Sequence, residues 1–328
     1  MSMPAFAKRI VSKAEFGPFV LLLAMVLIFW ELNPAFLSLR NISNTLAFTV
    51  ELGLIALAMT LLMTSGEFDL SVGSLFGFSP VLMWTLYNTG VASIEISFAI
   101  TLATALGIGL ISGLFVTRLK IPSFLVTLGM LLVVRGTALY VTNGFPQRTW
   151  NAKDLPLAQL LVGDFTVAGL KLHMSLLWFI AAAVLLGILL TRTKTGNWIQ
   201  ASGGNANAAR ARGVDVNRTK IKLFMLSAAM AGFAGIISSI RTAAANPNSG
   251  TGYGLEVIAM VVIGGTALTG GRGTIVGTVL GIFILRLMRN GIVLIGVPGL
   301  AYNIFIGTII LAMMALHSWL DRRHQEGS

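Results

Sequence analysis

The chain has 328 residues, of which 55% are hydrophobic and 11% are charged, and its mean hydropathy is +0.85. Soluble domains carry about 25% charged residues, so these charges are too few to cover a water-exposed globule, and lipid must cover much of the surface. The absence of cysteine excludes disulfides, thiolate metal sites and cysteine nucleophiles. The net charge of +11 does not indicate nucleic-acid binding, because the basic residues lie at the ends of apolar runs and not on one folded face.

The apolar runs predict a polytopic membrane protein. A helix needs about 20 apolar residues to cross the hydrocarbon, and by that measure there are roughly ten candidate spans. They are 17–33, 44–64, 70–88, 92–117, 122–141, 173–191, 220–241, 255–269, 273–295 and 299–319. The eighth is short, and the region from Gly66 to Gly77 is a candidate for a broken or re-entrant segment. We therefore predict an all-α transmembrane domain over 17–320, with a tail at 1–16 and another at 321–328.

The distribution of basic residues predicts the orientation. Lys8, Arg9 and Lys13 precede the first run, which has no cleavage site after it and is expected to stay as an uncleaved helix. With the N-terminus inside, 15 of the 23 basic residues fall on the inner side and 5 on the outer side. The outer ones are Arg40, Arg148, Lys153, Lys171 and Arg241; Arg135, Arg286 and Arg289 fall within spans. This bias predicts that both termini are cytoplasmic.

The segment from Gly196 to Lys222 is polar and basic, unlike its surroundings. Its small residues favour a short helix that begins near Asn205, an acceptable N-cap, and ends near Gly213, a natural C-cap. One interpretation is a helix on the cytoplasmic side that contacts another protein. The other is a solvated connector whose charges only fix the topology.

Ionisable residues inside membrane spans are costly and are candidates for function. Glu51, Asp69 and Glu256 are the candidates for a polar translocation path. The structural alternatives are pairing with a guanidinium for the two glutamates and capping of the next helix for Asp69. For Arg286 and Arg289, snorkelling toward the outer surface is favoured over a role at the substrate.

Small residues at a spacing of four predict close packing of helices in lipid. The glycines concerned are Gly109 and Gly113 in one run and Gly273, Gly277 and Gly281 in another. Enzymatic and cofactor motifs are missing: the chain has no Walker A loop and no HExxH pair. We expect no catalysis, no metal and no cofactor on this chain. The few carboxylates also disfavour a self-sufficient ion-coupled carrier.

Four stretches carry a resemblance to a known family. They are TSGEFDLSVGS (64–74), IPSFLVTLGMLLVVRG (121–136), ASGGNANAARARGVDVNRTKI (201–221) and GTGYGLEVIAMVVIGGTALTGGRGTIVGT (250–278). In these motifs the chain resembles the permease subunits of ATP-binding cassette importers for monosaccharides, the ribose-permease-like group. The resemblance covers most of the chain, from about Asn41 to the last span.

The resemblance implies a set of partners. They are a second permease subunit, an ATPase subunit that holds the ATP, and a periplasmic or lipid-anchored sugar-binding protein, all at the bacterial inner membrane. The family's cytoplasmic motif, which contacts the ATPase, maps onto Gly203, Gly204, Asn205, Ala208, Ala209, Arg212, Gly213 and Val214. Nucleosides or branched-chain amino acids are alternative substrates, and a non-transporting scaffold is a different class. Many relatives have a single residue between the glycine and the aspartate of the first motif. Here two residues, Glu67 and Phe68, stand between Gly66 and Asp69. Because of this departure, the identity of the sugar is not carried over from those relatives.

Overall fold

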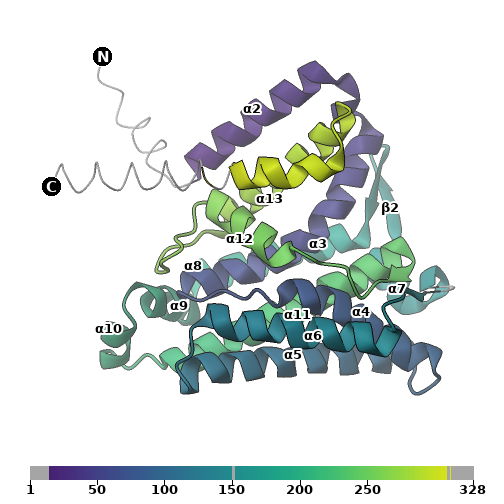
Figure 1. The fold of residues 1–328 in the computed structure, drawn as a ribbon. Helices are drawn as coiled ribbons and strands as arrows, with labels where there is room; N and C mark the ends of the chain where they lie inside the picture. Colours follow the sequence, from purple (N-terminus) through teal and green to yellow (C-terminus); the bar gives the residue numbers. More distant parts are fainter. Residues whose placement is uncertain (1–14, 150–151, 309–310, 312–328) are drawn as a thin grey trace, which may run out of the picture.

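The structure is a computed structural model that describes residues 15–149, 152–308 and 311, and it is mainly helical within them (Figure 1). The longer helices are α2 (Phe16–Leu32), α3 (Leu39–Thr64), α4 (Val72–Asn88), α5 (Ile94–Arg118), α6 (Ser123–Thr142), α8 (Met174–Arg192), α11 (Val216–Thr242), α12 (Tyr253–Ile263) and α13 (Ile275–Leu294). The short ones are α7 (Pro156–Val162), α9 (Lys194–Gly204), α10 (Ala206–Ala211) and the 3-10 turns η1 (Pro34–Leu37), η2 (Ala152–Asp154) and η3 (Gly299–Ala301). The C-terminal tail predicted at 321–328 and nearly all of the N-terminal one lie outside the described residues.

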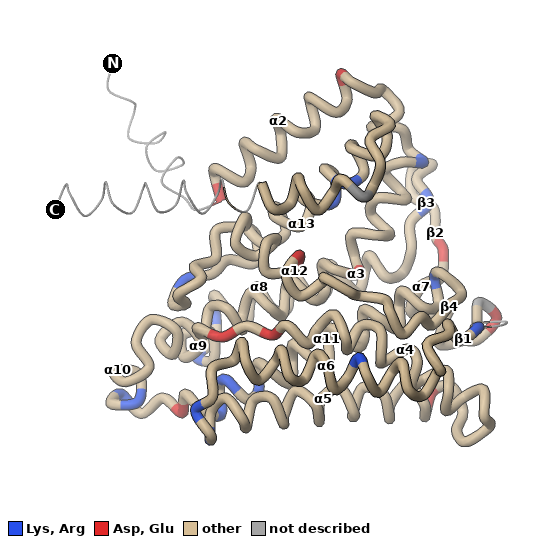
Figure 2. The backbone as a smooth tube through the Cα atoms, viewed as in Figure 1, with Lys and Arg blue, Asp and Glu red and all other residues tan. Residues whose placement is uncertain are grey.

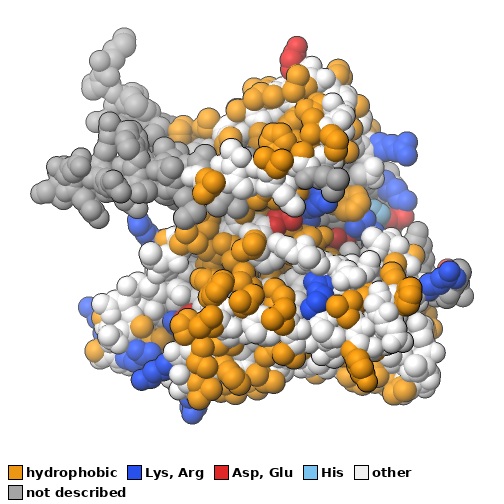
Figure 3. Space-filling model, in the orientation of Figure 1, with side chains coloured by type: hydrophobic (Ala, Val, Ile, Leu, Met, Phe, Trp, Pro, Cys, Tyr) orange, Lys and Arg blue, Asp and Glu red, His pale blue; other side chains and the backbone are white. Residues whose placement is uncertain are grey.

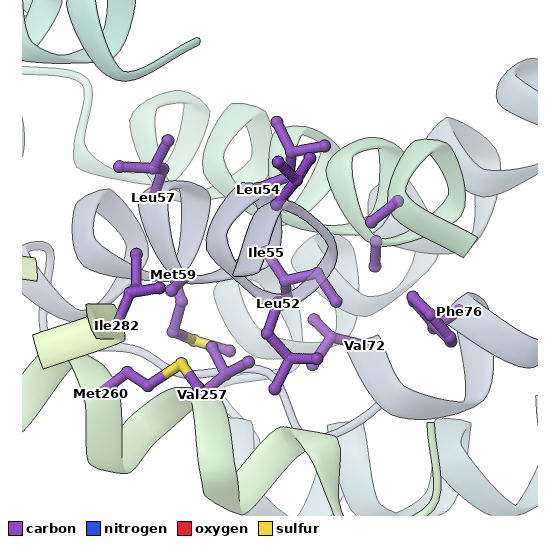
Figure 4. Packing of buried hydrophobic residues seen from close by; sticks show 14 of the residues in the cluster. Leu52, Leu54, Ile55, Leu57, Met59, Val72, Phe76, Val257, Met260 and Ile282 are labelled. Atoms are coloured by element: carbon purple, nitrogen blue, oxygen red, sulfur yellow. The ribbon is translucent and has the colours of Figure 1, made fainter. Parts of the chain in front are cut away.

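Helix α3 forms the centre of the bundle. Leu52, Leu54 and Ile55 point in different directions around it, and each is completely buried. A helix that is apolar on every side is stable only when other helices surround it. Figure 4 shows side chains of α3 beside Val72 of α4 and Val257 of α12. The core therefore lies where α3, α4, α11, α12 and α13 come together.

The peripheral helices leave apolar side chains exposed. The helices differ in how much of an apolar 18-residue stretch is buried. The buried share is 33% in α5, 17% in α6 and 22% in α8, against 89% in α3. Leu125 and Leu132 of α6 are among the exposed side chains, and hydrophobic side chains cover much of the face shown in Figure 3. Exposed apolar area of this extent suits contact with lipid or another subunit. The chain is a multi-pass membrane protein.

The structure revises the list of spans. Within the described residues, six helices are long and apolar enough to cross a membrane: α3, α5, α6, α8, α11 and α13. Helices α2 and α12 are shorter apolar helices. The eighth predicted span is wrong in extent: α12 has 11 residues, and residues 264–274 are not helical. Gly265, Gly270 and Gly271 have positive φ there, which ends the helix. Most of the predicted tenth span lies outside the described residues; 302–308 are helical.

Glycines allow close approach at two helix pairs. A Cβ on Gly109 would lie 2.5 Å from the Phe224 carbonyl oxygen of α11, and one on Gly113 would lie 2.9 Å from the Ile221 Cα. A Cβ on Gly277 or Gly281 of α13 would overlap a carbonyl oxygen of Gly264 or Met260, just after or within α12. The fifth predicted packing glycine, Gly273, precedes α13 and faces the Thr64 side chain.

Two small β-pairs lie at the end of the bundle away from α9 and α10 (Figure 1). Strand β1 (Gln147–Arg148) pairs antiparallel with β4 (Ala244–Ala245), and β2 (Asp164–Val167) forms a hairpin with β3 (Leu170–His173). The two turn residues of the hairpin, Ala168 and Gly169, both have positive φ, as a tight hairpin with right-handed strand twist requires. This segment gives structure to the long loop predicted at 142–172.

Candidate functional site

A polar cavity of about 610 Å³ opens among α3, α4, α11, α12 and α13. Its lining combines amides, hydroxyls, charged groups and aromatic rings: Asn41, Asn44, Thr45, Phe48, Glu51, Phe76, Ser238, Arg241, Thr242, Ser249, Gly250, Tyr253, Arg286, Arg289, Asn290 and Val293. Pockets that hold small molecules have volumes of about 300–1,000 Å³. In Figure 3, acidic and basic side chains gather in a recess below α2 and α13.

Glu51 and Arg241 form an ion pair at the edge of this cavity. The Arg241 Nε and Nη2 atoms donate to Glu51 Oε1 over 2.8 and 2.6 Å. The Arg241 guanidinium also lies 4.0 Å from the centre of the Phe48 ring, a cation–π contact. Glu51 thus lines a polar cavity and also has the guanidinium partner that its structural interpretation anticipated.

Glu256 is absent from the cavity lining and lies close to Arg286. The Tyr302 hydroxyl donates to Glu256 Oε1 over 2.7 Å, and Arg286 Nη1 is 3.7 Å from the same oxygen. The Arg286 side chain is 7% exposed. The expectation that Arg286 snorkels to the outer surface is therefore wrong: the side chain turns inward, because the cavity and the Glu256 carboxylate lie on that side. Arg289 is exposed, lines the cavity and lies over the Tyr302 ring at 5.0 Å.

The structure does not bring Asp69 to this cavity. Its Oδ1 atom accepts hydrogen bonds from the Ser71 N and Oγ atoms over 2.8 and 2.6 Å, and the residue is 1% exposed. This is a side-chain turn just before α4, which begins at Val72. Asp69 shapes the connection between α3 and α4, close to its structural interpretation.

Some polar contacts escaped the sequence analysis. Asn41 and Asn290 exchange two side-chain hydrogen bonds of 2.8 Å across the cavity lining, although 249 residues separate them. The Arg135 guanidinium donates to the carbonyl oxygens of Pro247, Ser249 (2.8 Å) and Gly73 (3.1 Å). The position of these polar residues within apolar runs could have marked them as candidates for buried hydrogen bonds. Their partners could not be predicted, because these depend on how the helices pack.

At the opposite end of the bundle, the short helix predicted after Asn205 is present as α10. Asn205 Oδ1 accepts a 3.0 Å hydrogen bond from the Ala208 N–H, and Gly213 has a φ of +84° just beyond the helix. Ala209 is buried, whereas Ala208 and Arg212 are exposed. Gly204 and Val214 flank the helix on either side. The result is a small projecting helix with one face against the bundle and the other free.

Gly203, the first residue of the mapped motif, makes a close contact within the chain. A Cβ at this position would overlap the Thr64 carbonyl oxygen and lie 2.6 Å from the Gly271 N atom. Gly271 N donates to the same Thr64 oxygen over 2.8 Å. The end of α9, the end of α3 and the loop before α13 therefore interlock through backbone contacts.

Glu67 belongs to the α10 end of the molecule. It accepts a 2.6 Å hydrogen bond from Lys220 Nζ, and both side chains are about 15% exposed. Lys220 lies near the start of α11, so this ion pair joins α11 to the turn after α3. Figure 2 shows basic residues gathered around this end of the tube. Glu67 is absent from the lining of the 610 Å³ cavity.

Comparison with known proteins places the chain in a family. The family model described as "Branched-chain amino acid transport system / permease component" matches residues 41–314. The ribose import permease protein RbsC of Escherichia coli (strain K12) is 34% identical over 299 residues, covering 90% of this chain and 91% of that protein.

Two further relatives cover nearly all of the chain. The xylose/arabinose import permease protein XylH of Sulfolobus acidocaldarius is 32% identical over 96% of this chain and 87% of its own length. The probable ABC transporter permease protein YphD of Escherichia coli (strain K12) is 33% identical over 98% and 94%. No solved structure matches the chain. The family match and these full-length similarities show that the chain belongs to the branched-chain amino acid transport system permease component family.

Proposed function

We propose that this chain is the membrane-spanning subunit of an ATP-binding cassette importer that carries a monosaccharide across the bacterial inner membrane. The relatives named for ribose and for xylose/arabinose support the sugar. Hydroxyl, amide and charged groups beside aromatic rings in the cavity are the groups that bind a polyhydroxylated solute. A sugar-binding protein would deliver the solute, and a second permease subunit would complete the passage.

One observation carries the proposal: the polar cavity and α10 lie at opposite ends of the same two helices. Asn41 and Arg241 line the cavity near one end of α3 and α11, and Glu51 lines it halfway along α3. Thr64 and Lys220 lie at the α10 end. Helices α3 and α11 have 26 and 27 residues, so each is about 40 Å long. A displacement of α10 would therefore reach the cavity through rigid, well-packed elements.

A separate ATPase subunit that binds the ATP would drive transport. Its closure would press on the exposed face of α10 and shift the permease between outward-open and inward-open states. Changing the ratio of two states from 1:99 to 99:1 requires about 5.5 kcal/mol of differential binding. ATP binding and hydrolysis would supply this energy, and contacts to α10 would transmit it. Asn205 and Gly213 fix the ends of that helix, and Ala208 and Arg212 are exposed on it.

The test is transport by the complex reconstituted with its ATPase and binding protein. Arg212→Glu and Gly213→Trp should abolish ATP-driven uptake and reduce recovery of the ATPase, while the permease still inserts and folds. Arg192→Glu, at the end of α8, is the matched control and should leave both unchanged. Normal uptake and normal recovery in both α10 variants would contradict the proposal, as would uptake driven by an ion gradient without the ATPase.

A further inference from the structure

The charges of the cavity do not balance. Two of its three arginines have a carboxylate beside them: Arg241 is bound to Glu51, and Arg286 lies 3.7 Å from Glu256. The third, Arg289, has no carboxylate within 4.0 Å among residues 15–149 and 152–308, and contacts the Tyr302 ring instead. With both pairs counted as neutral, the site keeps one positive charge.

Arg286 adds a second observation. It is 6% exposed, and its Nε–H has no hydrogen-bond partner among the described residues. The 3.7 Å separation from Glu256 is too long for a hydrogen bond. Buried donors are normally satisfied, and one that is left over calls for an acceptor from elsewhere. Arg286 lines the cavity, and a bound solute can supply that acceptor once the side chain rotates to turn the buried Nε atom toward the cavity.

Both arginines lie on α13, three residues apart and therefore on neighbouring positions of one helical face. A planar guanidinium binds a carboxylate or phosphate through two parallel hydrogen bonds, which makes arginine suited to anions. The rest of the lining, with Asn41, Asn44 and Ser238, offers donors and acceptors for hydroxyl groups.

We infer that the cavity selects a sugar acid, that is, a monosaccharide-sized polyol with one carboxylate, which Arg289 and Arg286 bind. This inference rests on the proposed function, because it assumes that the cavity lies on the path of the solute. A single uncompensated charge matches a carboxylate monoanion better than a phosphate ester, which carries about −1.5 to −2. The hydroxyls of the solute meet the amide and hydroxyl groups on α3 and α11.

Direct binding to the purified full chain in lipid nanodiscs tests the inference without the other subunits. The probes are D-gluconate, the neutral polyol D-glucitol of the same chain length, and D-glucose 6-phosphate. We expect gluconate to bind about tenfold or more tightly than glucitol, the size of effect that one charge-assisted contact produces. Equal binding of gluconate and glucitol, or tighter binding of the phosphate ester, would overturn the inference.

Variants assign the effect to the two arginines. Arg289→Gln and Arg286→Gln should each weaken gluconate binding about tenfold and leave glucitol binding unchanged. Arg192→Gln, at the far end of α8, also removes one positive charge and should change neither gluconate binding nor glucitol binding. An equal loss for both solutes in the α13 variants would show a structural role only and contradict the inference.

The outcomes separate this inference from the proposed function. If the complete importer takes up a neutral sugar and α10 variants abolish that uptake, while gluconate never binds, the sugar-acid assignment fails and the importer remains. If none of the probes binds, the cavity is not a solute site and the inference fails, although coupling through α10 is judged by its own test.

Discussion

Glu51 and Arg241 show how one buried pair ties distant parts of the chain together. Their side chains are 4% and 15% exposed, so little water solvates either charge when the other is removed. Glu51→Gln should lower the free energy of unfolding by about 3–5 kcal/mol, because it leaves the Arg241 guanidinium buried and unpaired. Unfolding by denaturant in detergent micelles measures the change.

The double variant Glu51→Gln with Arg241→Gln is the control for this prediction. It removes both charges and should recover much of the lost stability, since two neutral amides can hydrogen-bond to each other. A loss in the double variant equal to the sum of the losses in Glu51→Gln and Arg241→Gln alone would show that the two side chains do not interact. That result would contradict the pairing.

Asp164 predicts a pH dependence in the β2–β3 hairpin. Partial burial acts to raise the pKa of its carboxyl, but the hydrogen bond and charge of Lys171 and the neighbouring His173 ring outweigh it and hold that pKa below the ordinary 3.8. A depressed pKa in the folded state stabilises the hairpin above the unfolded pKa. That contribution is lost as the pH falls through the folded value.

Hydrogen exchange, corrected for intrinsic rates, checks this expectation. Amides of 164–173 should be protected at pH 6 and lose protection at pH 3 relative to those of α11. In Asp164→Asn the hairpin should behave alike at both values. A hairpin whose protection is the same at pH 6 and pH 3 in the unmodified chain would refute the assignment.

At the scale of elements, local sequence patterns predicted where several helices lie. Contacts between residues far apart in the sequence could not be predicted from those patterns. The apolar run at 44–64 anticipated α3, and Asn205 and Gly213 marked α10 because capping depends on residues a few positions apart. The end of α12 at Ile263 was not anticipated, since the apolar residues continue and the backbone of the following glycines decides it. Arg286 was misplaced because Glu256, on another helix, is its neighbour.

The contact between α12 and α13 gives a prediction for an element. A Cβ on Gly281 would overlap the Met260 carbonyl oxygen, so Gly281→Ala must push the two helices apart. We expect a loss of about 1–3 kcal/mol, the usual effect of overpacking. Gly136→Ala on α6 is the matched control: a Cβ there meets nothing within 4 Å, so the higher helix propensity of alanine should leave the stability unchanged or raise it. Equal stability of both variants in thermal unfolding would contradict close packing at Gly281.

At the scale of the whole molecule, the two ends of the bundle have different roles in the proposed importer. The cavity end carries the β-pairs and would meet the binding protein, and the α10 end carries the projecting helix and would meet the ATPase (Figure 1). This assignment requires that α10 face the cytoplasm, as the excess of basic residues near it predicts. The orientation in the membrane therefore decides whether a cytoplasmic ATPase can reach α10.

The chain provides a clean test of its own orientation because it contains no cysteine. Thr166→Cys in β2 and Asn207→Cys in α10 place single thiols on exposed positions at opposite ends. A membrane-impermeant maleimide should label Thr166→Cys in intact spheroplasts and label Asn207→Cys only after the membrane is permeabilised. The unmodified chain, with no thiol, gives the background. Labelling of Asn207→Cys in intact spheroplasts would place α10 outside, where no ATP-driven subunit can act on it.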